Sequence, residues 1–362
     1  MLKFLTAGES HGPALICIIE GLPAGLKIDV PAIDAELARR QKAPGRGERM
    51  KIEEDTVTVL SGLRGGVTLG SPLTMQILNR DYVNWEGIMH PHRPSTGQKV
   101  TCPRPGHADY PGMVKYGFDD ARNVLERASA RETALRTAIG AVARQVLRLK
   151  GVEIYSRVSA LGQLTFDAVA ETPEAYQRAQ AHPFSENESQ SQAAEELIAS
   201  CRATGVSVGG VVEIAAFNLP IGLGSYVHAD RRLDGRIAGA LMSIPAVRGV
   251  EIGEAFALAQ SPPGAPADSL RYDTERGIYY VGNANAGLAG GMTTGQPLVL
   301  RCAVKPLPTL APAMTVDLAT LLPATPVRER SDVTAVPTVA IVAEAVLAWA
   351  LLTALLEGPA RL

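Results

Sequence analysis

Apolar residues in the first half of this chain follow the period of a helix. They step by four, three, four and three positions, at Leu135, Ile139, Val142, Val146 and Leu149. This spacing predicts one face of an amphipathic helix. Ser129 and Glu132 match a capping box, in which the serine hydroxyl satisfies a free N–H and the glutamate reaches back to the cap. We therefore expect a helix that begins near Ser129 and ends near Gly151.

A second long run, from Val339 to Leu356, is almost wholly apolar. It is about long enough to span a membrane, but Glu344 lies inside it. Pro337 would lie in the first turn of the helix and Gly358 just beyond its end. We therefore predict a helix that is buried on all sides in the protein core, and no membrane partner.

Shorter apolar runs alternate with these helices and predict strands. They are Ala14 to Ile19, Thr56 to Leu60, Thr74 to Asn79, Val211 to Phe217 and Val299 to Val304. Alternation of strands and helices is typical of an α/β (α+β) fold. The two long apolar helices would lie between sheets, since such helices must be covered on both sides.

The chain contains an internal repeat. Residues 62–73 align with residues 287–298 without gaps and match at eight of twelve positions. We infer two related halves, about 1–151 and about 205–356, packed about a pseudo-two-fold axis within one domain that spans 1–362. Residues 152–204 interrupt the repeat, and their polar stretch 185–192 predicts an exposed connection.

Composition narrows the class of protein. With 362 residues and 46% hydrophobic content the chain can bury a full core. A formal net charge of −2 argues against nucleic acid or an anionic membrane as partner. The four cysteines are widely spaced without a C-x-x-C pair, which favours buried thiols in a reducing compartment over zinc or disulfides. The cysteine spacing therefore leads us to expect no metal site. No signal peptide is evident, so we expect a cytoplasmic protein.

The start of the helix after Ser129 is suited to an anion. It would carry unpaired N–H groups and the positive end of the helix dipole, and Arg127 and Arg131 flank it. A phosphate or carboxylate would be stabilised there. The alternative interpretation is an ordinary amphipathic helix with solvated arginines.

Six motifs occur in order along the chain. They are G-E-S-H-G-P from Gly8, R-P-G-H-A-D-Y from Arg104, R-x-S-x-R-E-T-A from Arg127, A-G-x-x-G-G-M-T-x-G from Ala286, K-P-x-P-T from Lys305 and E-R-S-D from Glu329. Together they resemble the chorismate synthase family over nearly the whole chain. The resemblance implies a β-α-β sandwich, a homotetramer, and the last step of the shikimate pathway. In that step 5-enolpyruvylshikimate 3-phosphate loses phosphate and a ring proton to give chorismate, with reduced FMN required although no net redox change occurs.

The substrate of that reaction carries two carboxylates and a phosphate, and arginine is best suited to bind such oxyanions. The candidate residues are Arg40, Arg46, Arg49, Arg104, Arg131 and Arg330. The resemblance also assigns Arg40 and Arg46 to possible NADPH contacts, so substrate and nicotinamide interpretations compete there. Pro44 and Gly45 make this segment a loop that could order over a ligand.

For FMN the resemblance implies a set of residues from several segments. They are Arg127, Ala128, Ser129, Pro245, Ala246, Gly290, Lys305, Pro306, Leu307, Pro308, Thr309 and Arg330. The glycine spacing near Gly290 is not that of a dinucleotide-binding fold, and a tight β-turn is the plain alternative there. Many relatives have serine where Ala128 stands and asparagine where Pro245 stands, so these two contacts would have to use the backbone.

Two histidines are the leading candidates for catalysis. By the resemblance, His11 donates a proton to the departing phosphate and His107 protonates or neutralises the reduced flavin. Histidine ordinarily exchanges protons near neutral pH, which suits both tasks. Ser10 and Asp332 would relay the ring proton away from the flavin. Well-satisfied loop histidines are the alternative interpretation.

Two further functions would use some of the same features. An NAD(P)H-dependent flavin reductase would also bind FMN beside cationic side chains. A binding protein for phosphorylated sugars without catalysis would leave His11, His107 and Asp332 without a purpose. Phosphate release by anaerobic enzyme with chemically reduced FMN separates the three.

Overall fold

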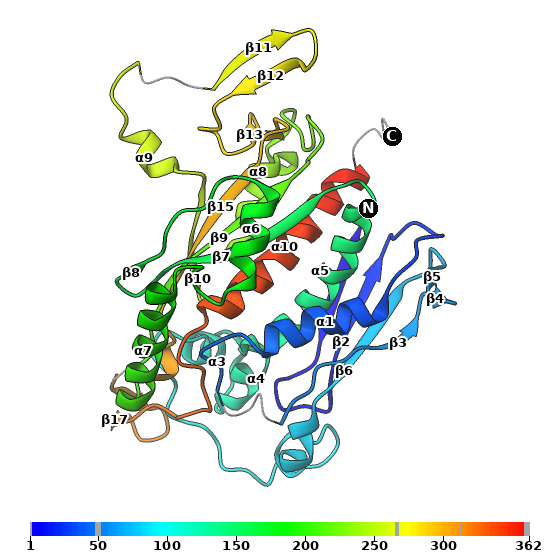
Figure 1. The fold of residues 1–362 in the computed structure, drawn as a ribbon. Coiled ribbons are helices and arrows are strands. Elements are labelled where there is room, and N and C mark those ends of the chain that lie inside the picture. The colour runs from blue at the N-terminus through cyan, green and yellow to red at the C-terminus, as the bar shows by residue number, and fades with distance from the viewer. Residues whose placement is uncertain (1, 48–51, 265–267, 311–312, 358–362) are drawn as a thin grey trace.

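The computed structural model describes residues 2–47, 52–264, 268–310 and 313–357. Two antiparallel sheets lie on either side of a layer of helices (Figure 1). The first sheet has the order β1 (Lys3–Ala7), β2 (Ala14–Glu20), β6 (Leu73–Leu78) and β3 (Thr58–Ser61). The second has the order β8 (Leu164–Thr165), β7 (Glu153–Leu161), β9 (Gly210–Phe217), β15 (Leu298–Val304) and β10 (Val247–Ile252).

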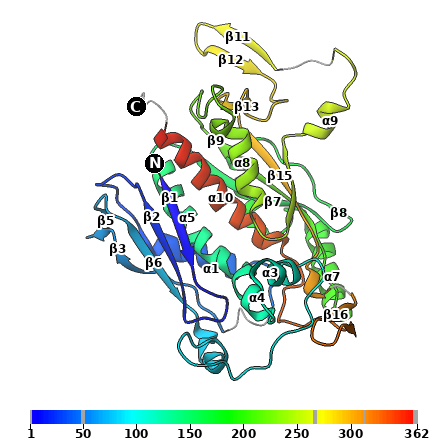
Figure 2. The same ribbon diagram turned by 180° about the vertical axis from the view of Figure 1, so that it is seen from behind.

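The helices between the sheets are α1 (Val30–Gln41), α5 (Thr133–Arg148), α8 (Leu233–Met242) and α10 (Val336–Glu357). Seen from both sides, α5 and α10 run next to each other through the middle of the molecule (Figures 1 and 2). The strands turn alternate residues toward these helices, as Leu73, Met75 and Ile77 of β6 do. One continuous hydrophobic core results.

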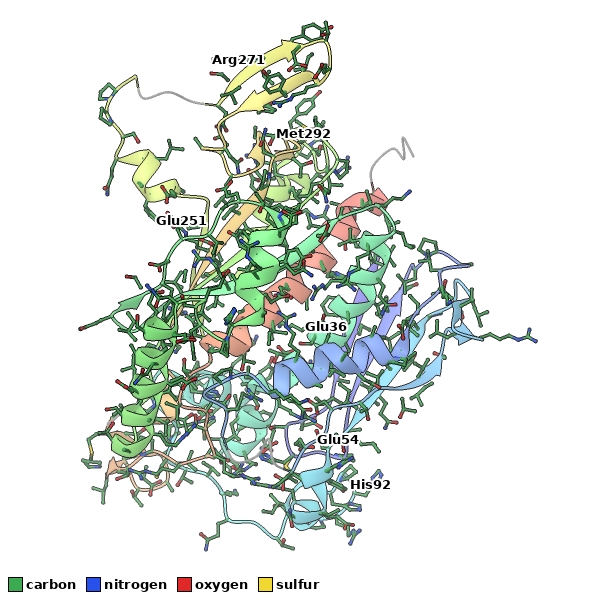
Figure 3. The ribbon with its side chains drawn as sticks, in the orientation of Figure 1. Glu36, Glu54, His92, Glu251, Arg271 and Met292 are labelled. Atoms are coloured by element: carbon green, nitrogen blue, oxygen red, sulfur yellow. The ribbon has the colours of Figure 1, made fainter. Side chains whose placement is uncertain are left out.

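The remaining elements are short or peripheral. They are β4 (Leu63–Arg64), β5 (Val67–Thr68), η2 (Arg80–Asn84), α2 (Glu86–Met89), α3 (Asp109–Tyr116), α4 (Arg122–Ala128), η3 (Ala130–Glu132), α6 (Pro173–Ala181), α7 (Glu188–Thr204), η4 (Ala229–Arg231), α9 (Ala255–Ala259), β11 (Ser269–Asp273), β12 (Gly277–Val281), β13 (Leu288–Ala289), β14 (Met292–Thr293), η5 (Pro308–Leu310), β16 (Thr315–Asp317) and β17 (Leu322–Ala324). The β11–β12 hairpin, which carries Arg271, projects from one end of the molecule (Figure 3).

The expected strands and helices are present, with one change at the start of α5. Ser129 Oγ accepts the Arg131 N–H at 3.3 Å, as a cap should. One turn of 3₁₀ helix then precedes the regular helix, which begins at Thr133. The Glu132 carboxylate pairs with Arg136 Nε at 2.9 Å, one turn farther along, in place of the predicted return to the cap.

The first part of residues 152–204, which the repeat left as a connecting segment, forms a strand of the second sheet. Strand β7 lies inside the second sheet, where it pairs with β9. The sequence does not indicate a buried strand here because Ser156 and Arg157 are polar. Both are nevertheless buried in the structure. Their partners are buried carboxylates, Glu344 for Ser156 and Glu213 for Arg157.

The two main sheets share a strand order. Read along each sheet, β1-β2-β6-β3 matches β7-β9-β15-β10. The aligned segments 62–73 and 287–298 each begin with a short hairpin, β4–β5 or β13–β14, and lead into β6 or β15. The strands that follow these segments hold corresponding places: β6 lies between β2 and β3, and β15 lies between β9 and β10.

Helix α10 is the one helix in the described part of the chain that is long and apolar enough to cross a membrane. Its most apolar stretch is 83% buried within the protein, as predicted for a core helix. Glu344 is fully buried and accepts from Arg39 Nη2 at 2.6 Å and Arg144 Nη1 at 2.8 Å. Glu36, on the side of α1 that faces the other helices (Figure 3), joins both arginines. This network ties α1, α5 and α10 together.

Helices α5 and α10 meet most closely at Gly140. A β-carbon placed there would lie 2.2 Å from Ala345 Cβ and 2.3 Å from Ala345 Cα. Such distances are far inside van der Waals contact, so only glycine permits this crossing. The close contact at Gly140 therefore fixes the distance between the start of α5 and the start of α10.

Candidate functional site

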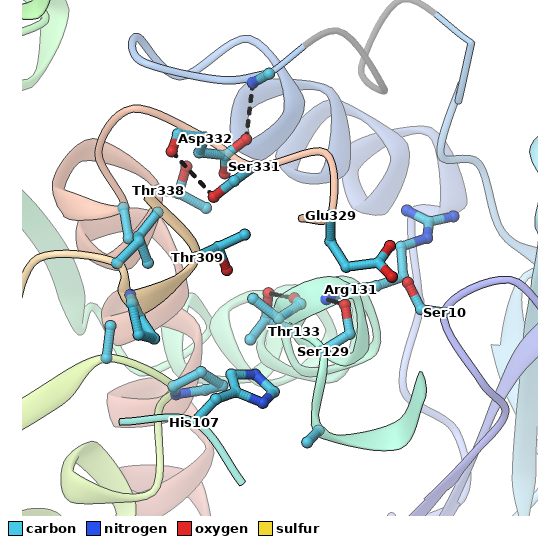
Figure 4. A pocket seen from close by; sticks show the side chains of 18 of the residues that line it. Ser10, His107, Ser129, Arg131, Thr133, Thr309, Glu329, Ser331, Asp332 and Thr338 are labelled. Carbon is cyan, nitrogen blue, oxygen red and sulfur yellow. Dashed lines mark hydrogen bonds between the residues drawn. The ribbon is translucent and has the colours of Figure 1, made fainter. Parts of the chain in front are cut away.

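The first turns of α5 and α10 line one cavity of about 340 Å³. Figure 4 shows side chains from both helices and from the loops before them around this space. All four predicted catalytic residues line it: Ser10, His11, His107 and Asp332. Segments far apart in the sequence therefore meet at a single site.

His11 lies on the loop between β1 and β2 and is held by a buried carboxylate. Its Nδ1 lies 2.9 Å from Glu126 Oε1, and its backbone N–H donates to Glu126 Oε2 at 2.8 Å. Burial raises the pKa of Glu126, but hydrogen bonds from His11 and the Arg122 guanidinium outweigh this and hold the pKa below its ordinary value. Glu126 is therefore a carboxylate at neutral pH and accepts a hydrogen bond from His11 Nδ1. The other ring nitrogen, Nε2, takes no part in this pair.

His107 has the same arrangement. Its Nδ1 lies 2.6 Å from Oδ1 of Asp109, which is fully buried at the start of α3. Asp109 also accepts from Arg104 through Nε at 2.8 Å and Nη2 at 3.0 Å. Burial raises the pKa of Asp109, but the hydrogen bonds from His107 and Arg104 outweigh it and hold this pKa well below its usual range. The ionised carboxylate fixes the His107 and Arg104 side chains in the cavity wall.

Asp332 faces the loop that follows α1. Its Oδ2 lies 2.7 Å from Arg46 Nη1, and its Oδ1 accepts the Gly47 N–H at 2.7 Å. Thr334, not Asp332, accepts the Val336 N–H at the start of α10, at 3.2 Å. Asp332 is therefore placed by the Arg46 loop and not by a helix-capping role.

Arg40 and Arg131 lie on one wall and share the buried Asp55. Arg131 Nη1 contacts its two oxygens at 2.6 and 2.8 Å, and Arg40 Nη1 lies 3.5 Å away. Arg131 also donates through Nε and Nη2 to Asn79 Oδ1. Burial, aided by the neighbouring Arg46, lowers the pKa of Arg40 to about 9. Glu53, also buried, lies 3.7 Å from Arg131 Nη2, so two carboxylates face the two guanidinium groups on this wall.

Lys305, Thr309 and Arg330 also line the cavity. Lys305 Nζ donates to Gly106 O at 2.7 Å, and burial together with Arg248 lowers the pKa of Lys305. Arg330 pairs with the buried Asp81. Leu307 and Pro308, between Lys305 and Thr309, also line the cavity.

Ala128, Ser129, Pro245 and Ala246 line the cavity as well. Because the side chains of Ala128 and Pro245 offer no hydrogen bond, contacts there fall to the backbone. Ala246 has a φ of 73°, a left-handed conformation that residues other than glycine rarely adopt. Its carbonyl accepts the Lys305 N–H at 2.9 Å, so this bend connects two predicted binding segments.

Some predicted residues do not line the cavity. Arg127 donates to the carbonyls of Thr6 and Gly8, at 3.0 and 3.1 Å, and so braces the His11 loop from outside. Gly290 lies in the turn of the β13–β14 hairpin with a φ of 58°, near Met292 in Figure 3. Pro306 is adjacent to the lining but not part of it. Arg49 lies outside the described residues.

Sequence reasoning missed the carboxylates that hold the two histidines. Asp109 stands inside the R-P-G-H-A-D-Y motif and Glu126 opens the segment 126–134, but neither was given a role. No motif or spacing in the sequence pointed to Trp85, whose indole stacks on the His11 ring. Asp55 had none either, because its link to Arg131 spans 76 positions of the chain.

One wall of the cavity is apolar. It is formed by Leu125, Ile244, Leu307, Ala335, Val339 and Val342. Within it Thr338 is buried, and in the described part of the structure its Oγ1 has no hydrogen-bond partner. An apolar wall, a hydroxyl left for a ligand and a cationic rim fit a molecule with a flat ring and anionic groups, and FMN is such a molecule.

The chain was compared with known proteins. A family model described as chorismate synthase matches residues 2–356. A chorismate synthase of Desulforudis audaxviator (strain MP104C) is 51% identical over 363 residues, covering 99% of this chain and 93% of the relative. One of Sulfurihydrogenibium sp. (strain YO3AOP1) is 48% identical over 370 residues, covering 99% and 94%. A solved structure titled "Crystal Structure of Chorismate Synthase" is 37% identical, has a TM-score of 0.78, and is matched over 98% of this chain and 92% of that one.

Proposed function

Because the chain belongs to the chorismate synthase family and so is a lyase of the shikimate pathway, we propose that its cavity converts 5-enolpyruvylshikimate 3-phosphate to chorismate. The reaction is an anti-1,4 elimination: the allylic C–O bond to phosphate breaks, a ring C–H bond breaks, and a new C=C bond forms. The observation that carries the proposal is the meeting of two histidines, each fixed by a buried carboxylate, in one cation-lined cavity.

Different arginines serve different ends in this proposal. Arg104 and Arg131 use their guanidinium nitrogens on Asp109, Asp55 and Asn79, so they shape the wall and supply its field. Arg46 pairs with Asp332 and Arg330 pairs with Asp81, and both arginines line the cavity. We assign the substrate oxyanions to these two arginines, because a planar guanidinium matches the geometry of a carboxylate or a phosphate. The buried Arg40 adds a positive charge to the cavity wall.

The residues around Lys305 hold FMN in this proposal. Lys305 and Thr309 bind its phosphate, and the apolar wall from α10 receives its ring. When bound in its reduced form, FMN supplies an electron-rich ring that aids departure of phosphate and takes up the ring proton. Arg127, Gly290 and Pro306, which do not line the cavity, contribute to FMN binding only through neighbours.

The histidines and Asp332 handle protons. His11 donates a proton to the departing phosphate, with Glu126 holding its Nδ1–H. His107 would protonate or neutralise the reduced flavin, with Asp109 holding its Nδ1. Ser10 and Asp332 pass the ring proton out of the cavity.

We also propose that the two halves arose by duplication, with the second half starting at β7 and not near residue 205. The shared strand order supports this reading. A single domain, a homotetramer and a cytoplasmic location complete the proposal, and the four free cysteines agree with a reducing compartment.

The test is anaerobic phosphate release from 5-enolpyruvylshikimate 3-phosphate with chemically reduced FMN and without nicotinamide. We expect sustained release with reduced FMN and none with oxidised FMN. Sustained release with oxidised flavin and no reductant would contradict the proposal. No phosphate release with reduced FMN, together with NADPH oxidation when oxidised FMN is supplied, would favour a flavin reductase.

A further inference from the structure

Trp85 lies between η2 and α2 and does not line the cavity, yet it touches the proposed proton donor. Its indole stacks on the His11 imidazole with ring centroids 3.9 Å apart and an angle of 22° between the rings. Trp85 is partly exposed, so the indole covers the imidazole from the outer side of the site. Neither the proposed reaction nor the cavity lining gives this tryptophan a role.

His11 needs such support because of where it stands. It lies on the loop between β1 and β2, not on a helix or strand. An imidazole turns easily about its Cβ–Cγ bond, whose torsional preference is broad. The hydrogen bond from Nδ1 to Glu126 fixes one edge of the ring but leaves the ring free to tilt about that bond. The stacked indole removes the tilt and so fixes the direction of Nε2.

One residue holds both of these supports. The Arg122 guanidinium carbon lies 5.0 Å from the centre of the Trp85 ring, at cation–π distance. Arg122 Nη1 also donates to Glu126 Oε1 at 3.2 Å, and its Nη2 lies 2.9 Å from Glu329. Because Glu329 lines the cavity, the imidazole, the indole and the loop before α10 form one connected assembly.

From this arrangement we propose that Trp85 is a positioning residue for His11. It acts through the imidazole, holding the ring so that Nε2 meets the leaving phosphate, and it does not touch the substrate itself. The inference rests on the proposed role of His11 as proton donor. It predicts that loss of the stack slows proton transfer and leaves ligand binding unchanged, since the cations that bind ligands lie on other walls.

The experiment compares Trp85→Leu, which removes the ring, with Trp85→Phe, which keeps an aromatic face. We expect kcat to fall by about 10- to 100-fold in Trp85→Leu, the scale of a misplaced reacting group. KM and the Kd for oxidised FMN, measured by flavin fluorescence, should stay within about twofold. Trp85→Phe should recover most of kcat because an aromatic ring can still stack. If Trp85→Leu does not fold, Trp85→Met replaces it with the same expectations.

Trp349 provides a matched control. It is the other tryptophan of the chain, lies on α10, and meets Phe4 edge to face at 5.0 Å. Trp349→Leu should lower the melting temperature and leave kcat near that of the unaltered enzyme. An equal loss of kcat in Trp349→Leu and Trp85→Leu would overturn the inference, since general loosening would then explain both.

A double-mutant cycle separates this inference from the function on which it rests. Trp85→Leu should cost less than about threefold once His11 is already Ala, because interacting residues are not additive. Near-normal turnover in His11→Ala would refute the proposed proton donor itself. Slow His11→Ala with normal Trp85→Leu would refute only the positioning role. A full loss from Trp85→Leu in both backgrounds would show that Trp85 acts elsewhere.

Discussion

Asp109→Asn tests the buried partner of His107 with a change of almost no volume. Asp109 accepts four hydrogen bonds, from the Arg104 N–H at 3.1 Å, Nε at 2.8 Å and Nη2 at 3.0 Å, and from His107 Nδ1 at 2.6 Å. An amide replaces one accepting oxygen by an NH₂ group that cannot accept. In either orientation of the amide, two of the four bonds are therefore lost.

The cost follows from burial. Arg104 is only 6% exposed and would remain charged without its counter-ion. Breaking a buried ion pair in this way costs about 3–5 kcal/mol. In a chain of 362 residues that loss corresponds to a fall of about 4–7 °C in the melting temperature. Turnover should fall by about 10²- to 10⁴-fold, because His107 loses the negative charge of the carboxylate that holds its ring.

Thermal unfolding, scanned upward from 25 °C, gives the melting temperature. Anaerobic phosphate release gives turnover, and both assays use the same protein preparations. Glu344→Gln is the control, because it also removes a buried carboxylate paired with two arginines, Arg39 and Arg144, but one that does not line the cavity. It should lower the melting temperature by a similar amount and leave turnover of the folded enzyme unchanged. Asp109→Asn with a normal melting temperature and turnover within twofold would refute the reasoning.

Acid provides a second check on Asp109. Although burial raises its pKa, the bonds from His107 and Arg104 hold that pKa below the ordinary value of 3.8. The folded-state pKa is thus depressed, so the carboxylate stabilises the fold above about pH 4 and this stabilisation is lost as the pH falls through the lower folded value. The difference in melting temperature between the two proteins should stay constant from pH 7 to 5 and shrink below pH 4.

Three further substitutions test the site and its frame. Asp332→Asn removes the negative charge but keeps an oxygen for the Gly47 N–H, so we expect melting temperature and oxidised-FMN affinity to hold while turnover falls by about 100-fold or more; near-normal turnover would end the proton-relay role. Gly140→Ala should destabilise by about 3 kcal/mol or more, since the new methyl group meets the backbone of Ala345. Gly239→Ala, in open space on α8, should instead stabilise slightly by about 0.5 kcal/mol, and chemical denaturation would show whether the two differ in sign.

The parts of the fold that were predictable are those whose pattern is local. The period of α5, the apolar length of α10 and the alternation in β6 each follow from neighbours in the sequence. The motif residues that line the cavity were also within reach, because the family resemblance singles out their motifs, although these stand in separate loops and helix starts.

The rest depends on contacts between distant positions. Strand β7 was missed because its buried Ser156 and Arg157 are satisfied by carboxylates on other elements. Glu126 stands 115 positions from His11, and no local pattern connects them. A buried polar residue looks like a surface residue until its partner is known, which is why the histidines were predicted and the carboxylates that hold them were not.

The crossing of α5 and α10 at Gly140 limits how this enzyme can be redesigned. A β-carbon at Gly140 would lie 2.2 Å from Ala345 Cβ, and both helices line the cavity. An engineer who wants room for a bulkier substrate gains nothing by altering the crossing, because any larger residue there moves both walls at once. Changes confined to the rim segments, such as the one carrying Pro245, can instead reshape one side while the opposite side keeps its place.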